Sequence, residues 1–207
     1  MRCSVRLAVH ISFGVVGCAL LASCASTSLV SSERNPDYSG SALKRLMVVG
    51  ATADTRTRKA FEDEFVAKLA AAGVAAVPSY PLLPESATTD PAALRKAAEG
   101  AGVDGVLAAR LVRVQENEAA LQAQAFNFAD RSVAFYGYYS ADAGSFDPTL
   151  AGESSTITIH FDLYSVPAAR LAWSGNAATF PSTDVTQVAA GLAYTLIPAL
   201  KKDKLIG

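Results

Sequence analysis

The feature that most constrains the fold of this chain is a hydrophobic period that changes from strand-like to helix-like and back. The run LKRLMVVGA (43–51) is short, apolar and rich in branched residues, which is typical of a buried strand. Residues 54–73 instead repeat apolar side chains every four positions, which predicts a helix. VAAVPSY (74–80) predicts a second strand, and PAALRKAAEGAG (91–102) predicts a second helix. VDGVLAARLVRV (103–114) is apolar on both faces, as expected for a central strand covered by helices.

The first of these helices has recognisable ends and one apolar face. Asp54 or Thr55 is expected to cap its start, and Gly73 is expected to end it. Phe61, Phe65 and Leu69 recur at four-residue spacing and would pack on the sheet. The charged side chains of the helix are expected to lie largely off that stripe; they are Arg58, Lys59, Glu62 and Asp63.

Residues 154–166 alternate strictly between apolar and polar, which predicts a half-buried strand. The apolar side is made of Ile157, Ile159, Phe161 and Leu163, and the polar side of Thr156, Thr158, His160, Asp162 and Tyr164. LAWSGNAATF (171–180) is expected to return as its antiparallel partner, with Leu171 and Trp173 inward. A last helix would start at Ser182 or Asp184, and Pro198 is expected to loosen or end it.

The order of these segments predicts the fold class. Strand, helix, strand, helix and strand in succession indicate parallel neighbours, and the later hairpin adds antiparallel pairing. Residues 43–207 are therefore expected to form a single α/β (α+β) domain, a mixed sheet with helices packed on it.

The first residues, MRCSVRLAVHISFGVVGCALLASC, have the pattern of a secretory leader. Arg2 and Arg6 precede an almost continuous apolar run over 7–22, and no acidic residue occurs before Cys24. Residues 1–23 are thus predicted to be a signal peptide. The run is shorter than the ~20 apolar residues that span a bilayer and is interrupted, so an uncleaved anchor is the weaker interpretation.

Leu21-Ala22-Ser23-Cys24 resembles the lipobox of bacterial lipoproteins. The resemblance implies diacylglycerol on the Cys24 thiol, cleavage before it, and acylation of the new amino terminus, for example with palmitate. Two or more acyl chains hold a protein stably at a membrane. Val15-Val16-Gly17-Cys18 fits the pattern loosely and remains a rival, although a cut there would expose the apolar stub ALLASCAS.

The residue after Cys24 is Ala25, not the aspartate that commonly signals inner-membrane retention. The same resemblance therefore implies the periplasm-facing leaflet of the outer membrane.

Residue usage excludes several kinds of site. All three cysteines, Cys3, Cys18 and Cys24, lie in the leader region, so no disulfide, thiol nucleophile or cysteine metal site is expected in the mature chain. His160 is its one histidine, which serves a metal poorly, and no cofactor-binding motif occurs. A whole-chain net charge of −1 gives no broad reason to bind nucleic acid.

Residues 25–42, ASTSLVSSERNPDYSGSA, are rich in Ser, Asn, Pro and Gly. Such a composition buries little apolar surface. Residues 24–42 are therefore predicted to be a flexible tether between the lipid and the domain.

Two segments are candidates for a catalytic or anion-binding site. His160 and Asp162 are close enough on one strand face to hydrogen-bond, but no Gly-x-Ser-x-Gly element supplies an activated serine, so a hydrolase is a weak alternative. The turn in VVGATADTRTRK could present backbone N–H groups to an anion, but it is neither a P-loop nor a Gly-x-Gly-x-x-Gly motif. An ordinary capped turn is the favoured interpretation.

The excursion 115–153 is the least ordinary segment. It gathers aromatic residues among Gly, Ser and Asp, and loops of this length tend to be functional or disordered. Phe135, Tyr136, Tyr138 and Tyr139 are the candidate partner-binding aromatics, since such side chains are enriched at interfaces. The alternative, that part of the segment extends the flanking strands as a hairpin, remains open.

The strand 43–51, the FEDEFVAKLAAAGV helix, the GVDGVLAARLV strand and the FDLYSV…LAWSG hairpin resemble small bacterial outer-membrane lipoproteins. Examples are the curli-secretion lipoprotein and the lipoprotein activator of penicillin-binding proteins. The resemblance covers roughly 43–114 and 154–200, within the boundary precision of sequence patterns, and implies fold more than function.

Two functions are compatible with these features. The first is a non-enzymatic envelope lipoprotein that binds or scaffolds a periplasmic partner. The second is an oligomeric component of an export or pore assembly, which the curli-like resemblance suggests. The sequence leaves the partner and the oligomeric state open.

Overall fold

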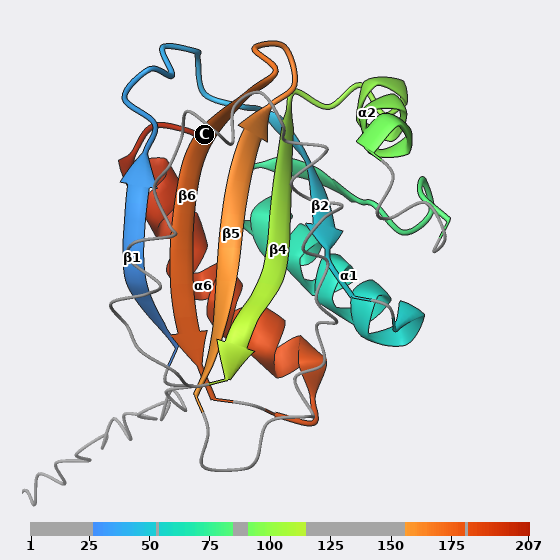
Figure 1. Ribbon diagram of the computed structural model, residues 1–207, viewed down its shortest axis with the longest axis vertical. Coiled ribbons are helices and arrows are strands. Elements are labelled where there is room, and N and C mark those ends of the chain that lie inside the picture. The colour runs from blue at the N-terminus through green and yellow to red at the C-terminus, as the bar shows by residue number, and fades with distance from the viewer. Residues whose placement is uncertain (1–26, 53, 85–90, 115–155, 181) are drawn as a thin grey trace, which may run out of the picture.

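The computed structural model describes residues 27–52, 54–84, 91–114, 156–180 and 182–207. Their strands form one six-stranded sheet in the order β1-β6-β5-β4-β2-β3 (Figure 1). The strands are β1 (Ser28–Arg34), β2 (Arg45–Gly50), β3 (Ala75–Pro78), β4 (Gly105–Val114), β5 (Ile157–Ser165) and β6 (Arg170–Thr179). The helices are α1 (Thr55–Ala71), α2 (Pro91–Gly100) and α6 (Val185–Lys202). The predicted single α/β domain with a mixed sheet is confirmed.

Strand direction divides the sheet into two parts. β2 runs parallel to both β3 and β4, as the strand–helix–strand order predicts. The β4–β5, β5–β6 and β6–β1 pairs are antiparallel. Since β4 is flanked by β2 and β5, its expected central position is also confirmed.

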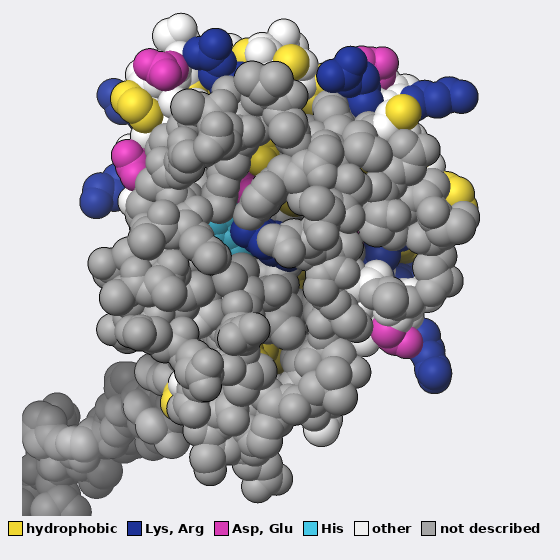
Figure 2. Space-filling view, viewed as in Figure 1, with side chains coloured by type: hydrophobic (Ala, Val, Ile, Leu, Met, Phe, Trp, Pro, Cys, Tyr) yellow, Lys and Arg dark blue, Asp and Glu magenta, His cyan; other side chains and the backbone are white. Residues whose placement is uncertain are grey.

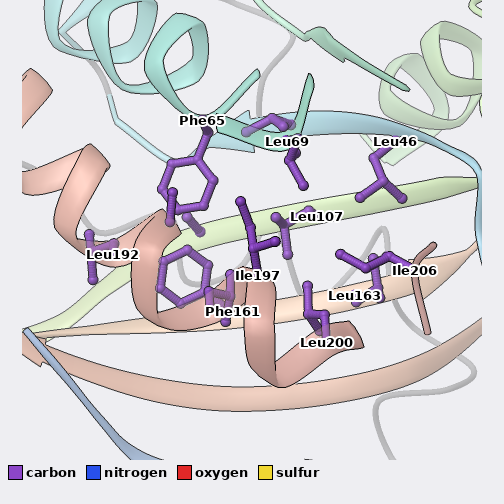
Figure 3. Packing of buried hydrophobic residues seen from close by; sticks show 14 of the residues in the cluster. Leu46, Phe65, Leu69, Leu107, Phe161, Leu163, Leu192, Ile197, Leu200 and Ile206 are labelled. Carbon is purple, nitrogen blue, oxygen red and sulfur yellow. The ribbon is translucent and has the colours of Figure 1, made fainter. Parts of the chain in front are cut away.

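The helices cover the two faces of this sheet unequally. Helices α1 and α6 lie side by side across one face, whereas α2 lies toward β2 and β4 on the other (Figure 1). The larger core lies under α1 and α6, where Phe65 packs with its ring centroid 5.7 Å from that of Phe161 on β5 (Figure 3). Leu192 and Leu200 of α6 enter the same cluster.

Local signals set the helix ends as predicted. Asp54 caps α1 by accepting a hydrogen bond from the Thr57 N–H at 2.6 Å, and Asp184 caps α6 through Thr186. Gly73 follows α1 with φ of +83°, a left-handed conformation that glycine adopts without strain.

The structure differs from the predicted tether over residues 28–42. Ser28–Arg34 form strand β1 on β6, and the following Asn35 and Tyr38 are buried. The side-chain Nδ2 of Asn35 donates to the Leu171 carbonyl oxygen at 2.6 Å. This polar stretch is ordered by hydrogen bonds to a neighbouring strand, which its composition does not reveal.

The second face of β5 also differs from expectation. Its apolar side is buried as predicted, but His160, Asp162 and Tyr164 on the polar side are 2%, 4% and 2% exposed. The strand is therefore buried on both faces rather than half-buried. His160 hydrogen-bonds to Asp162 on the same strand and to Asn176 and Ser174 of β6.

Two smaller expectations change for local reasons. Leu171 and Trp173 are both buried, but a register irregularity in the β5–β6 pair places them in the two different cores. Pro198 does not end the last helix, because α6 continues to Lys202 with Ile197 and Leu200 packed beneath it.

Candidate functional site

Among the described residues, the polar cluster centred on His160 has the chemistry closest to that of a catalytic site. β4, β5 and β6 place Arg110, His160 and Asn176 at the same register level across the sheet. The His160 Nδ1 atom lies 2.7 Å from Asn176 Oδ1, and its Nε2 atom lies 3.0 Å from Asp162 Oδ1. The predicted contact between His160 and Asp162 is therefore present.

The network around the imidazole ring indicates which nitrogen donates. Asn176 uses its Nδ2 amide to donate to the Ser31 hydroxyl at 3.0 Å, so its Oδ1 atom faces the ring. His160 Nδ1 then donates to that oxygen. The Ser174 hydroxyl lies 3.2 Å from Nε2, which Asp162 also contacts.

This geometry is not that of a serine hydrolase. In a catalytic triad the acid holds Nδ1, and the nucleophilic hydroxyl faces Nε2. Here an amide holds Nδ1, while Asp162 and Ser174 both contact Nε2. Ser174 is 0% exposed, and the histidine surface is a small cyan area in Figure 2. The cluster therefore joins β1, β5 and β6 and gives the hydrolase alternative no support.

A second buried polar network lies where β2, α1 and β3 meet. Arg58 and Glu62 are 3% and 0% exposed, with Arg58 Nε 2.9 Å from Glu62 Oε1. The expectation that these two charges lie off the buried stripe is wrong. One turn apart on α1, they face the end of β3, where Ser79 donates to Glu62 through both its N–H and its hydroxyl.

The same network occupies the backbone donors of the turn after β2. The Gly50 N–H donates to Glu62 Oε1 at 3.0 Å, and the Thr57 N–H donates to Asp54. The carboxylates of the chain itself therefore fill the positions that an anion would take. The interpretation as an ordinary capped turn is confirmed.

A shallow hollow of about 400 Å³ lies between the first turns of α1 and α6. It is lined by Arg56, Thr57, Ala60 and Thr183–Thr186. Hydrogen bonds from the helix residues lower the pKa of the two capping carboxyls, Asp54 chiefly through the Thr57 N–H and Asp184 chiefly through the Thr186 hydroxyl. The hollow is thus flanked by two exposed negative charges that cap helices.

Among the described residues, no group of three or more His, Cys, Asp or Glu is placed to hold a metal ion. The helices of that part of the chain include none that is both long and apolar enough to cross a bilayer.

The residues that the sequence singles out for lipid attachment and partner binding lie outside the described residues. They are Cys24, Phe135, Tyr136, Tyr138 and Tyr139. The structure does place the point at which the described chain begins. Thr27 lies against the end of β6, its hydroxyl oxygen 2.8 Å from that of Thr179.

Two exposed aromatic side chains were not singled out from the sequence. Phe180 follows β6 and is 51% exposed, and Tyr194 of α6 is 84% exposed. A signal for Tyr194 was present, because it falls outside the apolar stripe formed by Val188, Leu192 and Leu196. The sequence gives no such signal for Phe180, because its exposure can be inferred only when it is known that β6 ends directly before it.

Comparison with known proteins finds distant structural similarity alone. No family model matches the sequence, and no curated protein matches it. The PelC dodecamer from Paraburkholderia phytofirmans is 13% identical with a TM-score of 0.44, covering 87% of this chain and 99% of that one. A variant of the same PelC is 15% identical with a TM-score of 0.43, covering 84% and 96%. Lipoprotein GNA1162 from Neisseria meningitidis is 15% identical with a TM-score of 0.39, covering 77% and 95%.

Proposed function

We propose that this chain is a lipid-anchored envelope lipoprotein that binds or scaffolds a partner and performs no catalysis. The observation that carries the proposal is the order of leader, Leu21-Ala22-Ser23-Cys24 and then a folded domain starting at β1. A cysteine directly after an apolar leader and small residues is what acylation of the new amino terminus requires. The buried His160 cluster, in which each ring nitrogen meets a protein atom, supports a non-enzymatic role.

Acylation at Cys24 is tested by metabolic labelling with an alkyne analogue of palmitate and by mass spectrometry of the amino-terminal peptide. We expect label on the native protein, loss of label in Cys24→Ser, and retained label in the matched variant Cys18→Ser. Label that depends on Cys18 instead would move the processing site. An unlabelled native protein with a free amino terminus would contradict the proposal.

The proposed location is the periplasm-facing leaflet of the outer membrane, because Ala25 follows Cys24. Membrane fractionation checks this, with Ala25→Asp as the matched variant. We expect the native protein in the outer-membrane fraction and the aspartate variant in the inner-membrane fraction. Equal distribution of the two proteins would count against sorting by this residue.

We assign partner binding to the aromatic residues of the 115–153 segment. Support comes from its composition and from the strands that flank it, since Val114 at the end of β4 pairs in register with Ile157 at the start of β5. The strands that flank the segment therefore end and begin next to each other, at the end of the sheet where β6 also ends. Aromatic side chains supply large contact area at small entropic cost.

A photo-crosslinking amino acid at Tyr138, compared with one at the exposed Tyr194, tests this assignment in cells. We expect a discrete crosslinked partner from position 138 that is absent from position 194. Deletion of 126–146 should remove that partner without removing the protein from the membrane. The same crosslinks after the deletion would show that another surface binds the partner.

The second candidate is an oligomeric component of an export or pore assembly. Two observations favour self-association: β1 forms one edge of the described sheet, and Tyr194 stands 84% exposed on α6. Sedimentation velocity of the detergent-extracted protein distinguishes the candidates. A monomer at all concentrations would remove this second function, whereas a defined oligomer that Tyr194→Ala weakens would favour it.

A further inference from the structure

The distance between the lipidation site and the folded domain is much shorter than the sequence suggests. Thr27 is held against β6 by its contact with Thr179, and Ser28 pairs in register with Ala178. Cys24 precedes Thr27 by three residues, which span at most about 11 Å when fully extended. A flexible tether of the predicted 24–42 would instead have a root-mean-square span of roughly 23 Å.

This reach is comparable with the thickness of a lipid headgroup layer. The headgroup regions add about 10–15 Å to a hydrocarbon core of ~30 Å, which is roughly 5–8 Å in each leaflet. The acyl chains of a lipidated Cys24 enter the hydrocarbon core, so the sulfur lies near its boundary. A domain that begins at most about 11 Å away must hold its nearest end at the membrane surface.

We propose that the end of the domain where β1 begins and β6 ends faces the membrane, with Phe180 in the headgroup layer beside the lipidated Cys24. This inference rests on the proposed acylation. Phe180 directly follows Thr179, so its Cα lies one step of about 3.8 Å from the residue that contacts Thr27. Its side chain is 51% exposed, and its described neighbours Ser182 and Thr183 carry no charge.

An exposed phenyl ring at this place is explained by contact with lipid. Aromatic and apolar side chains of membrane-bound proteins enter the boundary between headgroups and acyl chains. Charged residues also occur at this end. Arg113 of β4 lies level with Ser28 and Ala178 across the sheet, and Asp54, Arg56 and Asp184 lie at the starts of α1 and α6. The three helix-start side chains are exposed, and their charges would stay among the hydrated headgroups.

The opposite end of the domain has the character of a water-facing surface. It holds the β5–β6 turn and the carboxyl terminus, and charged side chains of both signs gather there (Figure 2). Exposed basic residues at this end are Lys44, Arg45, Arg170, Lys201, Lys202 and Lys204. Such a surface resists burial in lipid because its charges would lose water. The short link requires the end that carries Phe180 to face the membrane, and the opposite end carries the larger number of described, exposed basic side chains.

Site-specific quenching tests the orientation on the full processed protein, purified from membranes and reconstituted in phosphatidylcholine–phosphatidylglycerol vesicles. Cys24 carries lipid after processing and the other cysteines leave with the leader, so an introduced cysteine is the one free thiol. An environment-sensitive fluorophore is attached in Phe180→Cys, in Ala168→Cys at the opposite end, and in Tyr194→Cys on α6. Spin-labelled lipid then quenches the label that lies at the membrane.

We expect the spin-labelled lipid to reduce the fluorescence of the label at position 180 and to leave that of the label at position 168 unchanged. Equal quenching at the two positions would overturn the orientation, and stronger quenching at position 194 would show that the domain lies on α6 instead. Inserting ten Gly and Ser residues between Ala25 and Ser26 adds a root-mean-square span of roughly 18 Å and should reduce quenching at position 180. Unchanged quenching after this insertion would show that the short link does not set the orientation.

Mass spectrometry of each labelled sample separates the two proposals. An acylated chain without the expected difference between positions 180 and 168 overturns the orientation and leaves the lipoprotein proposal intact. A chain without lipid at Cys24 overturns the proposed function itself.

Discussion

Glu62 is the side chain whose removal we expect to cost the most stability. Its carboxylate is 0% exposed and accepts backbone N–H hydrogen bonds from Gly50 at 3.0 Å, Ser79 at 2.6 Å and Tyr80 at 2.9 Å. The same group pairs with Arg58 Nε at 2.9 Å. One carboxylate therefore holds together the end of β2, α1 and the turn after β3.

The expected loss follows from these contacts. Glu62→Ala leaves a buried guanidinium unpaired, which costs about 3–5 kcal/mol. It also removes the acceptor of three N–H groups, at about 1–3 kcal/mol each where water does not replace it. Even the lower limits add up to about 6 kcal/mol, within the ~5–15 kcal/mol that stabilises a whole domain. Arg58→Met breaks the same pair and should cost about 3 kcal/mol, less than Glu62→Ala, because the carboxylate keeps its backbone donors.

Urea unfolding of the mature chain carrying Cys24→Ser measures the effect, followed by fluorescence of Trp173, the single tryptophan, which is 0% exposed. We expect the midpoint to fall in Arg58→Met and to fall furthest, or to disappear, in Glu62→Ala. Glu64→Ala is the matched control on the same helix, because it breaks a partly exposed pair with Lys68. That change should cost less than about 1 kcal/mol.

The double variant Arg58→Met/Glu62→Met tests the reasoning directly. Replacing a buried ion pair by apolar side chains is often neutral when the two charges interact mainly with each other. Here we expect the double variant to remain clearly destabilised, because the N–H groups of Gly50, Ser79 and Tyr80 still lack an acceptor. A midpoint equal to that of the parent chain would refute the assigned role of Glu62.

Three further predictions concern packing, pH and the His160 cluster. Gly175→Ala should lower the melting temperature at a cost of about 1–3 kcal/mol, because a Cβ there meets the indole ring of Trp173; calorimetry measures this. Stability should fall as the pH drops below about 3.8, because the pKa values of Asp54 and Asp184 are lowered in the folded state. The unfolded chain therefore binds protons before the folded chain does. The double variant with Asn at both positions should flatten this part of the curve of stability against pH. His160→Ala should lower stability by about 1–3 kcal/mol while membrane anchoring and the crosslinked partner stay unchanged, and an unaltered melting curve would contradict the structural role of the cluster.

Local patterns were sufficient to predict most helices and strands. Phe61, Phe65 and Leu69 recur with the helical period, so their spacing predicts the face of α1 that packs on the sheet. Asp54 and Gly73 act through the backbone within a few residues of themselves, and so the ends of α1 were also predictable. The same holds for the leader and Cys24 as predictions, because they rest on a contiguous pattern.

Features that depend on contacts between distant segments were not predictable in this way. The polar residues of β1 become a strand because β6 offers hydrogen-bond partners roughly 150 positions later in the chain. Arg58 and Glu62 are buried because the turn after β3 meets α1, which their own helical spacing cannot report.

By itself the sequence determined the order of strands and helices, the α/β fold class and the expectation of a lipid at Cys24, since each follows from neighbouring residues. Only the tertiary structure decided that Ser28–Arg34 form a strand on β6 and that His160 is buried in a network spanning three strands. The physical reason is that burial and hydrogen bonding between strands depend on which segments meet, and segments far apart in the chain meet only in the folded domain.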